Sequence, residues 1–129
     1  MENDQLFLDD PVKFYLAEVN KVPPVTRAEE ILCIQQIRAG GPQAASARTR
    51  LLEANLHLVV AIVEQYQKHN THILELIEKG NEGLLHALQN LSNNDQDSFK
   101  EHAKGYIQEA IKRAIESPEI VQPVHRDKV

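Results

Sequence analysis

The stretch ILELIEKGNEGLLHALQNL, residues 73–91, decides the fold because its apolar residues recur three and four positions apart. That spacing places them along one face of an α-helix, whereas a half-buried strand would need strict alternation. Two glycines, Gly80 and Gly83, interrupt the apolar positions. A glycine inside a helix costs about 1 kcal/mol relative to alanine. We therefore expect another element to pack closely against the helix at this point.

The first 41 residues are predicted to form a helical hairpin. Its first helix begins at Asp10-Pro11 and ends before Pro23-Pro24, with apolar residues at helical spacing between them. Thr26 and Glu29 form a capping-box pattern, which is typical of a helix start. The second helix then ends at Gly40-Gly41.

The rest of the chain is also predicted to be helical. A long helix is expected from Pro42 to about His69, and a fourth begins near Phe99 and ends near Ser117-Pro118. No segment has the alternating pattern of a strand. The sequence therefore predicts an all-α fold, a compact helical bundle that forms a single globular unit. Its parts are the hairpin (residues 1–41), a helical core (residues 42–117) and a C-terminal tail (residues 118–129).

Composition limits the function classes that need to be considered. The 129 residues have a net charge of -5, which argues against a general nucleic-acid binder held by phosphate neutralisation. The single cysteine, Cys33, lies beside Ile31, Leu32 and Ile34, so it is expected to be a small buried side chain. No apolar run is long enough to cross a membrane, and no leader sequence is visible. We therefore expect a soluble cytoplasmic protein without membrane contacts.

Catalytic and metal-binding patterns are weak. Of the six histidines, only His69 and His72 lie close in sequence, and no cysteine or tight carboxylate cluster accompanies them. The Gly80 to Gly83 segment lies inside a helix rather than between a strand and a helix, so it is not a phosphate-binding loop. We expect no metal, no cofactor and no enzymatic activity.

Polar residues gather on one face of the 73–91 helix. At helical periodicity Glu75, Glu78, Asn81, Glu82 and Leu85 fall within one sector beside the apolar stripe. Spacing alone leaves two interpretations open: a solvated helix face, or a surface that binds a partner with a basic rim and an apolar centre.

The fourth helix carries a mixture of charges. Lys104, Lys112 and Arg113 could approach phosphate groups, but acidic residues are interleaved with them. Glu109 and Arg113 are four positions apart, a spacing that favours an ion pair between them. A mixed, solvated face is therefore the alternative to a nucleic-acid contact.

Six segments together resemble the primary-type sigma factors of bacterial RNA polymerase. DPVKFYLAEVNKVPPVT and EEILCIQQIRAG are similar to the helical hairpin that precedes the second domain of these factors. LLEANLHLVVAIVEQY resembles the long helix of that domain, and LELIEKGNEGLLHAL resembles its polymerase-binding helix. YIQEAIKRAI resembles the end of the promoter-reading helix, and IVQPVH the stretch that leads into the third domain. The resemblance runs from about Asp10 to Ile115.

The resemblance implies a partner and a docking surface. In this family the polymerase-binding helix docks on the coiled coil of the polymerase clamp, in the largest subunit, through an acidic or amide-bearing face. The docking positions correspond here to Glu75, Glu78, Asn81 and Leu85, and Glu82 lies in the same sector. These residues form the candidate polymerase-binding site.

The promoter-opening residues of the family are largely replaced. Where the resemblance calls for aromatic side chains that stack on unpaired bases, the chain has Asn93, Asp97, His102 and Gly105. Asn94 and Asp95 stand in place of a pair of arginines, and Glu109 replaces a residue that would face upstream promoter bases. The candidate DNA contacts that remain are Lys100, Lys104, Tyr106, Lys112 and Arg113.

The leading hypothesis is a sigma-factor-like transcription protein that binds core RNA polymerase, with promoter recognition and melting weakened or lost. A second hypothesis is an authentic sigma factor, or a fragment of one, that directs initiation at particular promoters. A third is a helical adaptor that binds another protein through the same acidic face. Promoter DNA and an anti-sigma factor are further candidate partners.

Overall fold

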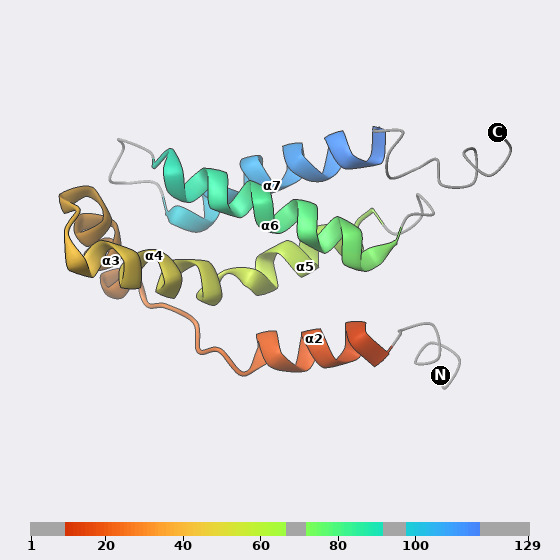
Figure 1. Cartoon of the computed structure of the whole chain (residues 1–129), viewed down its shortest axis with the longest axis horizontal. Coiled ribbons are helices and arrows are strands. Elements are labelled where there is room, and N and C mark those ends of the chain that lie inside the picture. The colour runs from red at the N-terminus through yellow and green to blue at the C-terminus, as the bar shows by residue number, and fades with distance from the viewer. Residues whose placement is uncertain (1–9, 67–71, 92–97, 117–129) are drawn as a thin grey trace, which may run out of the picture.

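The computed structural model describes residues 10–66, 72–91 and 98–116, and the chain is helical throughout these ranges apart from short connections (Figure 1). This confirms the predicted all-α fold. The helices are α2 (Asp10–Asn20), α3 (Arg27–Ala39), α4 (Pro42–Ala54), α5 (Leu56–Glu64), α6 (Ile73–Gln89) and α7 (Phe99–Glu116). None of the helices in this part of the chain is both long and apolar enough to span a membrane.

The centre of the fold is the pair α6 and α7, which lie along each other, with α5 packed against both (Figure 1). The fully buried side chains come from four helices, and burying each large aliphatic one stabilises the fold by roughly 1.5–3 kcal/mol. The largest of them are Leu51, Ile62, Leu76, Leu84, Ile107, Ile111, Val59 and Val63. The apolar faces of α6 and α7 therefore form the core together with residues of α4 and α5.

The two glycines of α6 allow its neighbours to approach closely, as the sequence predicted. A Cβ atom built on Gly83 would lie 2.6 Å from the carbonyl oxygen of Tyr106 in α7. A Cβ atom on Gly80 would lie 2.6 Å from Cγ1 of Val59 in α5. Both distances are too short for a carbon atom, so α6 needs glycine at both positions to keep its present neighbours.

The prediction of one long helix from Pro42 is wrong in one respect. The helix is interrupted at Asn55, which separates α4 from α5. Asn55 has φ -114°, outside the helical region. Its side-chain Nδ2 donates to the carbonyl oxygen of Leu51 at 2.8 Å, which is the acceptor its own N–H would use in a continuous helix. That N–H instead donates to the Leu52 carbonyl oxygen. The predicted end at His69 lies outside the described residues.

The start of α3 is fixed by a cap and by an ion pair to α4, on which α3 packs, whereas α2 packs on α5. The Glu29 N–H donates to Oγ1 of Thr26 at 3.1 Å, which confirms the predicted cap. The Glu29 carboxylate does not complete the capping box, because it accepts from Nε and Nη2 of Arg50 at 2.7 and 3.1 Å. Arg50 also donates to the Pro23 carbonyl oxygen at 3.0 Å. Hydrogen bonding to Arg50 lowers the pKa of Glu29 below its ordinary value.

The buried side of α3 includes a carboxylate. Cys33 is buried, as predicted, but its neighbours Ile31 and Leu32 are 40% and 51% exposed. Glu30 is buried instead, and its carboxylate accepts a hydrogen bond from the backbone N–H of Phe99. A carboxylate of α3 therefore caps the N-terminus of α7, which a helical pattern within α3 could not indicate.

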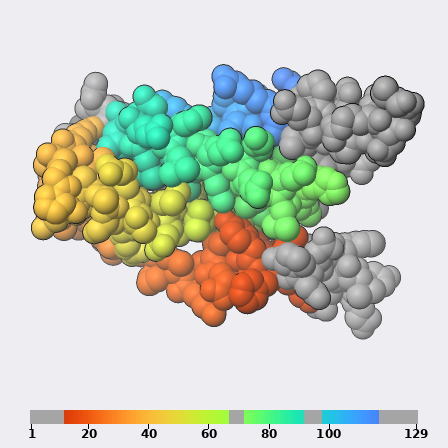
Figure 2. Space-filling view, viewed as in Figure 1, coloured from red at the N-terminus to blue at the C-terminus, as the bar shows by residue number. Residues whose placement is uncertain are grey.

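The helix α2 lies along one side of the molecule, against the surface formed by α5 and α6 (Figure 2). Its buried side chains are Val12 and Val19, two of the apolar positions that predicted this helix. Leu16 and Val12 face Val60 of α5 and Ile77 of α6 across a small hollow. Packing of these apolar side chains therefore holds α2 in place.

Candidate functional site

One face of α6 is left uncovered by the core. Glu78 and Glu82 are exposed, Glu75 is half-buried, and Leu85 is 43% exposed. The opposite side of the helix is buried, with Leu76 and Leu84 fully inaccessible. We refer to Glu75, Glu78, Glu82 and Leu85 as the acidic face. Helical spacing had placed these residues together, and in the structure they lie on the solvent side of one helix.

The charges of the acidic face are poorly compensated within the chain. Lys79 Nζ lies 3.9 Å from Oε2 of Glu82, and an exposed pair at this distance stabilises the fold by at most about 1 kcal/mol. Glu75 and Glu78 form no ion pair with any residue that the structure describes. The face therefore presents a negative charge with an exposed leucine beside it, which suits a basic partner with an apolar side chain.

Asn81 differs from the other predicted docking residues. Its Nδ2 donates to the Tyr15 hydroxyl oxygen of α2 at 3.3 Å, and the side chain is only partly accessible. Its Oδ1 is buried and accepts no hydrogen bond within the described ranges. Asn81 thus lies at the edge of the acidic face, and its amide contacts α2.

The candidate DNA-binding residues of α7 do not form one patch. Lys100 and Lys104 are exposed and lie one turn apart, on one side of the buried stripe of the helix. Tyr106 and Arg113 lie on the other side of that stripe, seven positions apart. Arg113 Nε donates to Oε2 of Glu109 at 3.2 Å, as the sequence predicted. Lys112 is exposed between these two groups.

The aromatic side chains of α7 are engaged with one another. The His102 ring lies 6.2 Å from the ring of Phe99 and 5.1 Å from that of Tyr106, measured between centroids. His102 Nε2 is 3.3 Å from the carbonyl oxygen of Ala87. Phe99 is 2% exposed and belongs to the core. The replaced promoter-opening positions 93–95 and 97 lie outside the described residues.

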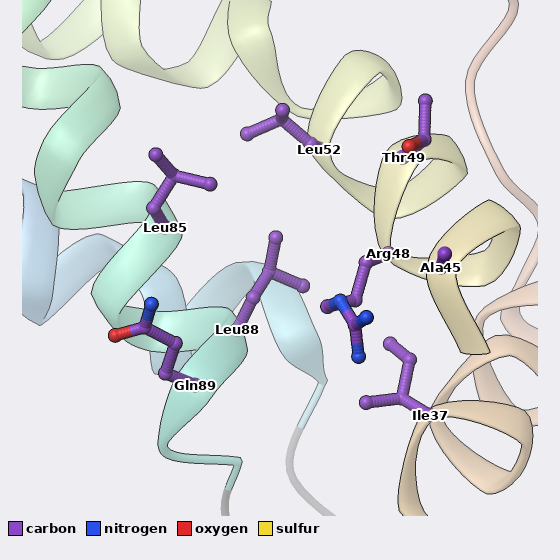
Figure 3. A pocket seen from close by; sticks show the side chains of 8 residues that line it. All are labelled: Ile37, Ala45, Arg48, Thr49, Leu52, Leu85, Leu88 and Gln89. Atoms are coloured by element: carbon purple, nitrogen blue, oxygen red, sulfur yellow. The ribbon is translucent and has the colours of Figure 1, made fainter. Parts of the chain in front are cut away.

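A hollow beside the acidic face was not predicted. It lies between α4 and α6, with α3 at one end, and has a volume of about 660 Å³ (Figure 3). We call it the Leu85 groove, and its lining residues are Ile37, Ala45, Arg48, Thr49, Leu52, Leu85, Leu88 and Gln89. The lining comes from three helices that are far apart in sequence, so no local pattern could have indicated it.

Among the residues that the structure describes, no group of three or more histidine, cysteine, aspartate or glutamate side chains is arranged to hold a metal ion. Cys33 is a free, buried thiol, and burial raises its pKa.

Comparison with known proteins agrees with the resemblance seen in the sequence. Residues 10–43 match the family model for region 1.2 of sigma-70 factors. Over 120 residues, 92% of its length, the chain is 38% identical to the RNA polymerase sigma factor SigA of Lactococcus lactis subsp. lactis and 41% identical to SigA of Clostridium acetobutylicum. It is 39% identical to SigA of Listeria monocytogenes over the same share of the chain.

The match covers 31% of each of these relatives, so the chain spans about a third of their length. Along nearly its whole length the chain is thus similar to one region of these sigma factors.

Proposed function

We propose that this chain binds core RNA polymerase through the acidic face of α6 and modulates transcription without opening promoters in the usual way. The SigA relatives are named as sigma factors of RNA polymerase, which supports the partner. The acidic face supports the site. The clamp coiled coil of the largest subunit, implied by the resemblance, is the proposed element of the polymerase that α6 binds.

This proposal rests above all on one observation: an unpaired carboxylate, Glu78, and an exposed apolar side chain, Leu85, lie on the same face of α6. Glu78 has no ion-pair partner among the described residues, and Leu85 leaves 43% of its surface in water. An exposed apolar side chain on the same face as carboxylates is typical of a binding surface with an apolar centre and a polar rim. The buried side of α6 packs on α7, so the face is held on a rigid support.

Weak promoter opening is supported by the chemistry of α7. Opening a promoter requires aromatic side chains that stack on unpaired bases, and each stack contributes roughly 1–3 kcal/mol. Gly105 offers no ring, His102 is half-buried between two other rings, and Tyr106 is partly covered by His102. Glu109 further neutralises Arg113. These residues leave α7 with few groups to offset the cost of unpairing bases.

The proposed site is tested by reversing one charge of the acidic face. Glu78→Lys should weaken binding to core polymerase at least about tenfold, which corresponds to about 1.4 kcal/mol, because the new lysine repels the basic partner. The control is Glu116→Lys, which makes the same charge change at an exposed position at the end of α7. Affinities are measured by biolayer interferometry with immobilised core polymerase and no DNA.

Stability separates a lost contact from a lost fold. Glu78 is exposed and makes no described ion pair, so Glu78→Lys should unfold at nearly the same temperature as the parent chain. Parent-like binding by Glu78→Lys would show that the acidic face does not contact polymerase. Equal losses for Glu78→Lys and Glu116→Lys would show that only net charge matters.

A second candidate function is promoter-specific initiation by an authentic sigma factor, and the exposed lysines of α7 favour it. Lys100 and Lys104 lie one turn apart and have no ion pair in the described part of the chain, so they could contact phosphate. Permanganate footprinting with core polymerase distinguishes the two functions. An open bubble on a standard promoter with the unmodified chain would establish the second one.

A further inference from the structure

The Leu85 groove adjoins the acidic face, and Leu85 belongs to both. In Figure 3 the side chains of Leu85 and Leu88 of α6 face Leu52 of α4 across the hollow, with Ile37 of α3 at its far end. Leu88 is buried and forms the floor, whereas Leu52 and Ile37 are half-buried. Apolar surface therefore continues from the exposed Leu85 into the groove.

The charged residue of the groove is Arg48, whose guanidinium is unpaired among the described residues. Figure 3 shows the Arg48 side chain extending from α4 into the space beside Leu88 and Gln89. Arg48 forms no ion pair or hydrogen bond with the described residues, whereas Arg50 on the same helix is held by both carboxylate oxygens of Glu29. The guanidinium of Arg48 therefore remains able to bind a carboxylate in a two-bond arrangement.

The charges on the two sides of Leu85 have opposite signs. Glu78 and Glu82 lie on the acidic face of α6, and Arg48 lies across the groove on α4. A segment that crosses both surfaces meets negative charge, then apolar surface, then positive charge. A segment that is complementary to these surfaces therefore carries a basic group, an apolar side chain and an acidic group in that order.

We propose that the docking surface continues from α6 into the Leu85 groove, and that one polymerase segment occupies both. That segment places a basic side chain against Glu78, an apolar side chain beside Leu85 and a carboxylate on Arg48. This inference rests on the proposed function, because it assigns the same partner to a surface that neither the sequence nor the relatives indicate.

Two substitutions test the groove without altering the acidic face. Ala45→Trp fills the groove from α4, and Ser46→Trp adds the same side chain at the adjacent exposed position, which does not line the groove. Arg48→Glu reverses the charge of the unpaired guanidinium, and Lys13→Glu makes the same charge change at an exposed position of α2. All four positions are exposed or partly so, and thermal unfolding of each variant verifies the fold.

Binding of the 129-residue chain to core polymerase is measured in the absence of DNA. Ala45→Trp and Arg48→Glu should each weaken binding about tenfold, while the two controls retain parent affinity. The loss caused by Arg48→Glu should shrink as salt is added, because exposed charges are screened, whereas the loss caused by Ala45→Trp should persist.

The outcomes separate this inference from the proposed function. If Glu78→Lys weakens binding but Ala45→Trp and Arg48→Glu bind as the parent does, the groove is not occupied by polymerase and this inference is wrong while the acidic face stands. If Glu78→Lys binds core polymerase as tightly as the parent chain does, the proposed function itself is wrong. A third outcome also overturns the inference. The parent chain sediments as a dimer, Ala45→Trp sediments as a monomer, and both bind polymerase with the same affinity. The groove would then bind a second copy of the chain.

Discussion

The contact between α6 and α7 makes a quantitative prediction at Gly83. Alanine at this position would place its Cβ 2.6 Å from the carbonyl oxygen of Tyr106 and 3.0 Å from Cα of Ile107. Both atoms belong to the backbone of α7, so the methyl group fits only if the two helices move apart. Overpacking a core costs about 1–3 kcal/mol, and a backbone contact places this site at the upper end. The better helix propensity of alanine offsets about 1 kcal/mol, which leaves a net loss of about 2 kcal/mol.

Gly105 on α7 provides the matched control. A Cβ at Gly105 meets no atom within 4 Å and the residue is exposed, so Gly105→Ala gains helix propensity without a steric cost. It should stabilise the fold by about 1 kcal/mol. The two alanine variants should therefore differ by about 3 kcal/mol in free energy of unfolding.

Urea denaturation followed by far-ultraviolet circular dichroism measures this difference. With the slopes usual for small proteins, about 3 kcal/mol separates the two midpoints by roughly 1 to 3 M urea. If Gly83→Ala unfolds at the same urea concentration as Gly105→Ala, or at a higher one, the close approach of α6 and α7 is wrong.

Three further predictions concern stability. The pKa of Glu29 is lowered by its hydrogen bond to Arg50, so the pair stabilises the fold above the ordinary value of 4.5 and the stabilisation is lost as the pH falls through the lowered pKa. Thermal unfolding should therefore show Glu29→Gln less stable than the parent at neutral pH, with the gap closing in acid; a gap independent of pH would refute this. Glu30→Ala should cost about 1–2 kcal/mol in urea denaturation because the Phe99 N–H loses its acceptor, whereas Glu30→Gln should retain most of the stability. Leu84→Ala empties a fully buried site and should cost roughly 2–5 kcal/mol, and a smaller loss would mean that this core position is less tightly packed than the structure indicates.

Local patterns predicted most of the fold. The spacing of apolar residues in α6 and α7 indicated both helices and their buried faces, because packing two long amphipathic helices leaves few alternatives. The break at Asn55 was missed because it depends on a side-chain amide that competes with the backbone for the Leu51 carbonyl. The buried carboxylate of Glu30 was missed because its partner, Phe99, lies 69 residues away.

The candidate site was predictable to the same extent. Helical spacing brought Glu75, Glu78, Glu82 and Leu85 together because all four lie on one helix. The same spacing included Asn81, but its hydrogen bond to Tyr15 depends on how α2 packs, which spacing within α6 does not contain. The Leu85 groove could not be predicted either, because α3, α4 and α6 create it together.

The central claim is that this chain uses the surface of core polymerase to which a primary sigma factor binds. Competition measures this directly: labelled chain is bound to core polymerase, and unlabelled primary sigma factor from the same organism is added in increasing amounts. One shared surface predicts that the labelled chain is displaced completely, and that Glu78→Lys added as a competitor displaces it poorly. A labelled chain that stays bound at saturating sigma factor would contradict the account.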